Sequence, residues 1–189
     1  VIDKILVTRH LNGVLPEEIQ KSVRSVAAIS PGVMGITGIE TVEIIQGVVE
    51  KLKPDLIIAI DALAARKFSR INSTIQMSDT GVAPGAGVGN KRMTLNEQTL
   101  GVPVLALGVP TVVDAATLIN DTMDRMLEEM IAQTEQGSAF YEMLHNMDTD
   151  EKYRLIVDIL NPYVGNMFVT PKEVDAVVER LANIIANAI

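Results

Sequence analysis

The chain has 189 residues, of which 48% are hydrophobic and 21% are charged, a composition typical of a folded globular protein and not of a disordered one. The chain contains no cysteine, which excludes disulfides and thiolate catalysis, and its net charge of −8 disfavours direct binding to nucleic acid. No apolar stretch approaches the roughly 18 residues of a membrane span, so we expect no membrane partner.

The first third of the chain is predicted to form a strand–helix–strand unit. Lys4–Thr8 predicts a first strand, and Val26–Ile29 is a second apolar run. Apolar residues then recur at helical spacing up to about Leu52, and Thr37 with Glu40 has the spacing of a capping box at the start of that helix. The next strand follows directly, and this order favours a right-handed parallel crossover.

The remainder of the chain continues the alternation of strands and helices. Strands are predicted at 71–77 and 103–109, a helix from about 111 to Gln133, helices at 150–160 and 171–188, and a short edge strand at 168–169. Thr111 and Thr170 are the candidate caps of two of these helices, and Asp114 falls in the first helical turn. We therefore expect one α/β domain over 1–189, a three-layer α/β/α arrangement with a mostly parallel twisted sheet, and a helical C-terminal portion from about 138.

Asp61 is the candidate functional residue that the strand pattern itself singles out. Residues 56–60 are apolar without alternation, which predicts a strand buried on both faces and ending at Asp61. Ligands of open α/β sheets gather at such strand ends, and a carboxylate there is costly to bury unless it is used or paired. The alternative is an Asp that accepts backbone N–H bonds at the start of the next helix.

Two glycine-rich segments are candidate substrate-binding loops. In residues 30–41, glycines allow positive φ and close backbone approach, and the following helix offers free N–H groups to an anion or a carbonyl; a tight strand-to-helix turn is the alternative. Residues 78–92 match neither a P-loop nor a dinucleotide-binding spacing, and a loop of this length favours a substrate-binding role. The candidate substrate-binding residues are Gly32, Gly35, Thr37, Gly38, Asp79, Gly85, Gly87, Gly89 and Asn90.

Five strings in the sequence resemble the germination protease of spore-forming Firmicutes. They are residues 29–41, 58–66, 78–81, 84–92 and 108–115. The resemblance implies a fold similar to hydrogenase maturation proteases and synthesis as a zymogen that assembles as a homotetramer. It also implies an endopeptidase that cuts small acid-soluble spore proteins in the cytoplasm of the germinating spore, the spore core, and that needs no cofactor.

The same resemblance implies an atypical aspartic mechanism with two aspartates. Asp61 matches one of them, and the other belongs to a Thr-Pro-Asp motif upstream, which this sequence does not contain. The chain also does not begin with Met, so we expect a fragment that lacks the propeptide, the first segment and one catalytic carboxylate. In such a dyad two neighbouring carboxyls share one proton, and both are needed. Because we expect this chain to supply one of the two, we expect it alone to have negligible activity.

Two further hypotheses remain open at this stage. One is a metal-assisted peptidase of the hydrogenase-maturation type, although His10 and His145 fall in different segments and we predict no metal ligands. The other is an inactive fragment that acts only by binding a partner or by self-association.

Overall fold

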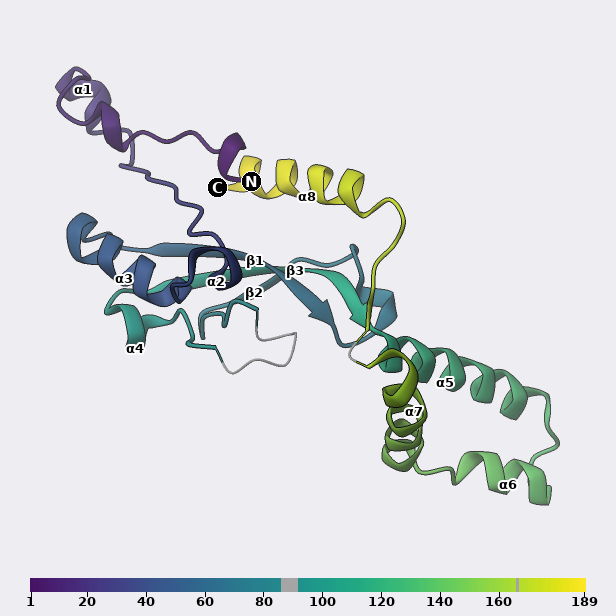
Figure 1. Cartoon of the computed structure of the whole chain (residues 1–189). Coiled ribbons are helices and arrows are strands. Elements are labelled where there is room, and N and C mark those ends of the chain that lie inside the picture. The colour runs from purple at the N-terminus through teal and green to yellow at the C-terminus, as the bar shows by residue number, and fades with distance from the viewer. Residues whose placement is uncertain (86–91, 166) are drawn as a thin grey trace. The chain divides into compact units, whose positions relative to one another are not determined.

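The computed structural model describes residues 1–85, 92–165 and 167–189. The chain divides into two compact units. Residues 55–172 form the sheet unit, and residues 1–54 together with 173–189 form the terminal unit. Figure 1 shows the elements of both.

The sheet unit is built around a small mixed sheet. Its strands are β1 (Ile57–Ala65), β2 (Gln76–Ser78), β3 (Val104–Asp114) and β4 (Phe168–Val169). β1 pairs with β3 in parallel, whereas β2 and β4 both pair with β3 in the antiparallel direction. Mixed α/β structure is confirmed and β4 lies where an edge strand was predicted, but the sheet is mixed where we predicted a mostly parallel one.

β3 is the central strand and supplies much of the core. Val104, Ala106, Val109 and Val113 are all buried, because β3 has neighbours along both of its edges. β1 stands at the end of the strand order, and its Ile58 remains 37% exposed. The prediction that the Asp61 strand is buried on both faces is therefore wrong, and the description fits β3 instead.

The lengths of three strands also differ from the prediction, and one of them is β3, which was predicted over 103–109 and runs to Asp114. β1 does not stop at Asp61 but continues to Ala65, because the small residues after Asp61 go on pairing with β3 as far as Val113. β2 is confined to 76–78, and Asn72 before it is held in the left-handed region (φ 55°), its N–H donating to the carbonyl of Pro110 at 2.8 Å. Asp61 thus lies in the middle of a strand and not at its carboxyl end.

The α-helices described in the sheet unit are α4 (Glu97–Leu100), α5 (Ala115–Gln133), α6 (Ala139–His145) and α7 (Thr149–Val164), and a short 3₁₀ helix spans Phe68–Arg70. α5 follows β3 directly and ends at Gln133 as predicted. Its cap is Asp114 and not Thr111, because the Asp114 carboxylate accepts the N–H groups of Ala116 and Thr117 at 2.9 and 3.2 Å. α5 packs against α7, where the buried Lys152 forms an ion pair with Asp124.

The terminal unit contains α1 (Glu17–Gln20), α2 (Met34–Thr37), α3 (Thr41–Leu52) and α8 (Val174–Ala188). α3 ends at Leu52 as predicted, but its cap is Glu40, which forms a capping box with Glu43; Thr37 instead closes α2. α8 begins after Glu173. Its predicted cap, Thr170, belongs to the sheet unit and donates its hydroxyl to the carbonyl of Thr111 at 2.8 Å.

The predicted strand at Lys4–Thr8 is absent, and the second apolar run at Val26–Ile29 forms no strand either. The two segments do meet, through backbone hydrogen bonds and the side chain of Thr8. The N–H of Thr8 donates to the carbonyl of Val26 at 3.0 Å, while the N–H of Val26 donates to the hydroxyl of Thr8 at 2.9 Å. Because a hydroxyl takes the place of a backbone carbonyl, the pairing does not continue as a β-ladder. Since residues 1–40, all of them described, contain no strand before α3, the predicted parallel crossover does not form.

Over the described residues, none of the helices combines the length and the apolar character that a membrane crossing requires.

Candidate active site around Asp61

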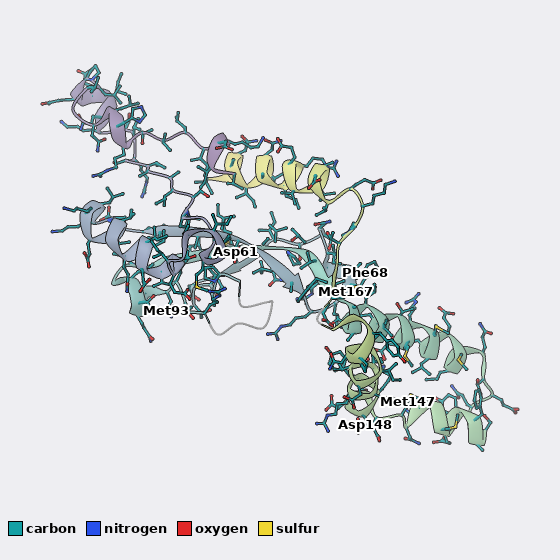
Figure 2. The ribbon with its side chains drawn as sticks, viewed as in Figure 1. Asp61, Phe68, Met93, Met147, Asp148 and Met167 are labelled. Atoms are coloured by element: carbon teal, nitrogen blue, oxygen red, sulfur yellow. The ribbon has the colours of Figure 1, made fainter. Side chains whose placement is uncertain are left out.

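Asp61 lies at the centre of β1, opposite Gly108 of β3 (Figure 2). Two backbone N–H groups donate hydrogen bonds to its carboxyl. The first belongs to the next residue, Ala62, whose nitrogen lies 2.9 Å from Oδ1. The second belongs to Gly85, in the segment that follows β2. The carboxyl is therefore held by its own strand and by a residue 24 positions further along the chain.

Burial raises the pKa of the Asp61 carboxyl above its ordinary value of 3.8, and the N–H groups of Ala62 and Gly85 act in the opposite direction. Burial raises the pKa because removing a carboxylate from water penalises its charged form, and this effect is larger than that of the two N–H groups. A carboxyl with a raised pKa and an oriented geometry is the kind of group that acid–base catalysis uses. Both donors are backbone groups, so they orient the carboxylate without adding a charge.

Leu63 packs on the residue of β3 that lies opposite Asp61. A Cβ atom added to Gly108 would lie 2.2 Å from Leu63 Cδ1, so the Leu63 side chain occupies the space that a side chain at Gly108 would fill. Asp61 and Leu63 are two residues apart on one strand, which places them on the same face of the sheet. Leu63 thus covers the position of β3 that pairs with Asp61.

Among the described residues, the structure places one of the predicted substrate-binding residues, Gly85, at Asp61. Gly85 contacts Asp61, whereas Asp79, six residues earlier, has an exposed side chain. Gly87, Gly89 and Asn90 lie outside the described residues. The other four predicted residues belong to the terminal unit, where Gly32 and Gly38 have the positive φ angles expected of them, 76° and 69°, and Gly35 and Thr37 lie in α2.

Sequence reasoning missed three residues that shape this site: Leu63, Gly81 and Gly108. Gly81 and Gly108 both lie in the strings that carry the family resemblance, and this was the available signal. What fixes each glycine is a close contact with a residue distant in sequence, Leu95 for Gly81 and Leu63 for Gly108. No local pattern encodes such contacts.

The described residues contain no group of three or more His, Asp or Glu side chains arranged to hold a metal ion. An open groove of about 840 Å³ does exist in the sheet unit, between α5, α7 and the segment around Phe68, but Asp61 does not line it. Phe68 and Met147, which line this groove, are labelled in Figure 2 away from Asp61.

Comparison with known proteins identifies the family. The family described as germination protease matches residues 1–139 and 125–189, which together cover the whole chain. The chain belongs to the germination protease family. Its membership confirms the resemblance carried by the five strings around Asp61 and the glycine-rich segments.

Curated germination proteases align with the full chain. That of Clostridium perfringens strain 13 is 59% identical over 189 residues, and that of Caldanaerobacter subterraneus subsp. tengcongensis is 52% identical; both alignments cover 100% of this chain and 58% of the relative. The Geobacillus sp. WCH70 protein is 45% identical, with 59% of its length covered. The chain thus spans less than two thirds of the length of these relatives.

Proposed function

We propose that the protein carrying this sequence is an endopeptidase that degrades small acid-soluble spore proteins during germination, with Asp61 as a catalytic carboxyl. The observation that carries the proposal is Asp61 itself. In a member of the germination protease family, a carboxyl with a raised pKa is held by two backbone N–H groups. The similar proteins are germination proteases, and the proposed protease activity and its setting in germination follow from this similarity.

The proposed chemistry is aspartic. Hydrolysis of a peptide bond requires removal of a proton from the attacking water and delivery of a proton to the amide nitrogen that leaves. An ionised carboxyl does the first and a protonated carboxyl does the second, so two neighbouring carboxyls complete the cycle. We assign Asp61 to one member of such a pair without dividing the acid and base roles, because a coupled pair titrates as a unit.

Around this centre we propose the finer features that the family resemblance implies. The glycine-rich segments at 30–41 and 78–92 each contribute to binding of the substrate chain. The complete protein has the three-layer architecture of hydrogenase maturation proteases, assembles as a homotetramer and acts in the spore core. The net charge of −8 favours cationic substrate segments.

The test uses the complete product of the gene, incubated with a purified small acid-soluble spore protein, with cleavage followed by mass spectrometry. Asp61→Asn keeps the shape of the side chain but cannot exchange a proton, and we expect it to lower the cleavage rate at least about 100-fold. Asp55→Asn, which changes an exposed carboxylate in the same segment, is the matched control. Cleavage by Asp61→Asn at the rate of the unmodified protein would refute the catalytic role.

A chelator added to the same assay separates the aspartic from the metal-assisted hypothesis. Aspartic chemistry predicts no change in the cleavage rate. Loss of cleavage with the chelator, restored by adding a divalent metal, would instead establish metal dependence.

A further inference from the structure

The segment after β2 crosses to the strand that carries Asp61. Ser78, the last residue of β2, pairs with Ala106 of β3, and β3 separates β2 from β1 in the sheet. Yet Gly85, only seven residues later, donates its backbone N–H to Asp61 on β1. The chain must therefore turn sharply after Ser78 to reach the carboxyl.

Gly81 lies at this turn in a conformation that residues with a side chain rarely adopt. Its φ is +87°, a left-handed conformation that favours glycine. A Cβ atom at this position would also lie 2.1 Å from the carbonyl oxygen of Leu95 and 2.7 Å from Asn96 Cβ. The obstacle at Leu95 is backbone, so a side chain at position 81 could be accommodated only if the chain itself moved.

Backbone hydrogen bonds stabilise the contact directly after Gly81. The N–H of Val82 donates to the carbonyl of Leu95 at 3.1 Å, and the N–H of Leu95 donates to the carbonyl of Val82 at 2.8 Å. The neighbouring Asn96 is fixed in turn, because its side chain accepts the N–H of Thr99 at 3.0 Å and caps α4. The segment that delivers Gly85 is thus attached to an ordered support three residues before it reaches Asp61.

We propose that Gly81 is a positioning residue for Asp61: it lets the chain lie against Leu95 and Asn96, so that the backbone N–H of Gly85 is held on the carboxyl. The proposal deepens the proposed function, from which it takes the catalytic role of Asp61. The contact itself does not depend on that role.

The consequence is electrostatic as well as geometric. Ala62 and Gly85 approach the carboxyl from different parts of the chain, so together they fix its rotation. Each N–H stabilises the ionised form, and both lower the pKa against the effect of burial. Near Gly85, the Nε atom of Arg92 lies 3.9 Å from a Cβ atom built on the glycine.

The test compares Gly81→Ala with Gly101→Ala in the 189-residue chain. Gly101 also has a positive φ, +70°, but a Cβ there would meet nothing within 4 Å, so the control carries similar backbone strain without the collision. The pKa of Asp61 is measured by ¹³C NMR of the side-chain carboxyls, with its signal assigned through Asp61→Asn. We expect the pKa of Asp61 to shift upward in Gly81→Ala and to stay unchanged in Gly101→Ala. An unchanged pKa in a folded Gly81→Ala protein would overturn the proposal.

A second measurement needs no glycine variant and so does not depend on the folding of one. In the unmodified chain, the amide proton of Gly85 should titrate with the same midpoint as the Asp61 carboxyl, and Asp61→Asn should abolish that transition. If the amide proton of Gly85 did not titrate with Asp61, the proposal would be overturned even if the spore protein is cleaved. Conversely, full cleavage by Asp61→Asn would refute the catalytic role and leave the NMR result standing.

Discussion

Asp61 on β1 lies opposite Gly108 on β3, and the space above Gly108 is filled by Leu63, the residue two positions after Asp61. The absence of a side chain on β3 therefore lets an apolar side chain of β1 fold over the sheet beside the carboxyl. The packing of Leu63 therefore depends on the absence of a side chain at position 108.

Gly108→Ala is expected to destabilise the protein. The new methyl group would lie 2.2 Å from Leu63 Cδ1 and 2.7 Å from Leu63 Cγ, so Leu63 has to leave its position. Overpacking of this kind lowers the free energy of unfolding by about 1–3 kcal/mol, measurable by urea denaturation. Gly47→Ala is the control: it lies within α3 with nothing within 4 Å, and should raise stability by about 0.5–1 kcal/mol. A neutral Gly108→Ala would show that Leu63 moves without cost.

How far the sequence predicts this structure depends on the range of the interactions. The ends of α3 at Leu52 and α5 at Gln133, and the short strand β4, follow from patterns within a few residues, and all three were predicted. The pairing of Thr8 with Val26 was not predicted, because a side-chain hydroxyl replaces a backbone carbonyl as the acceptor there. Local apolar pattern alone predicts a strand in such a segment.

The same division applies to the candidate site. Asp61 could be found from a carboxylate after an apolar strand and from the family strings around it. The contact with Gly85, the collision at Gly81 and the packing of Leu63 on Gly108 are long-range, and each depends on strand register. The extension of β1 beyond Asp61 is likewise decided by pairing with β3, and not by the residues of β1 alone.

The stability of the protein should depend on pH through Asp61. Because burial raises the pKa of Asp61 above 3.8, the folded protein binds this proton more tightly than the unfolded chain does. The stabilising contribution of the protonated carboxyl is fully present below pH 3.8 and is lost as the pH rises through the folded-state pKa.

Asp61→Asn removes this titration. The free energy of unfolding of both proteins is measured by urea denaturation at a series of pH values. The value for Asp61→Asn minus the value for the unmodified protein should increase as the pH rises from 3.8 to neutral. Asp55→Asn serves as the comparison, since Asp55 is exposed. A difference between Asp61→Asn and the unmodified protein that stays constant with pH would contradict the assignment of the raised pKa to Asp61.

The ion pair between Lys152 and Asp124 should respond asymmetrically to removal of either partner. Lys152 is only 7% exposed, whereas the Asp124 side chain is 40% exposed. Asp124→Asn leaves the ammonium buried without its counter-charge and should lower the free energy of unfolding by about 3–5 kcal/mol. Lys152→Met should lower it less, because water can solvate the remaining carboxylate.

Urea denaturation of both variants checks the order of the two effects, and a second ion pair provides the control. Arg125 pairs with Glu128 and Glu129 at 3.7 Å on the exposed surface of α5, so Arg125→Ala should change stability by less than about 1 kcal/mol. If Lys152→Met proved more damaging than Asp124→Asn, burial of the lysine would not be the controlling factor.

The start of α5 should depend on Asp114 and not on Thr111. Asp114 accepts the N–H groups of Ala116 and Thr117, so Asp114→Ala leaves both without their partner and should lower the free energy of unfolding by about 0.5–2 kcal/mol. Asp114→Asn retains an acceptor oxygen and should recover most of this loss. Thr111→Val removes the hydroxyl that the sequence suggested as the cap, and thermal unfolding should find it close to the unmodified protein. An equal loss in Thr111→Val and Asp114→Ala would mean that the hydroxyl contributes to the helix start after all.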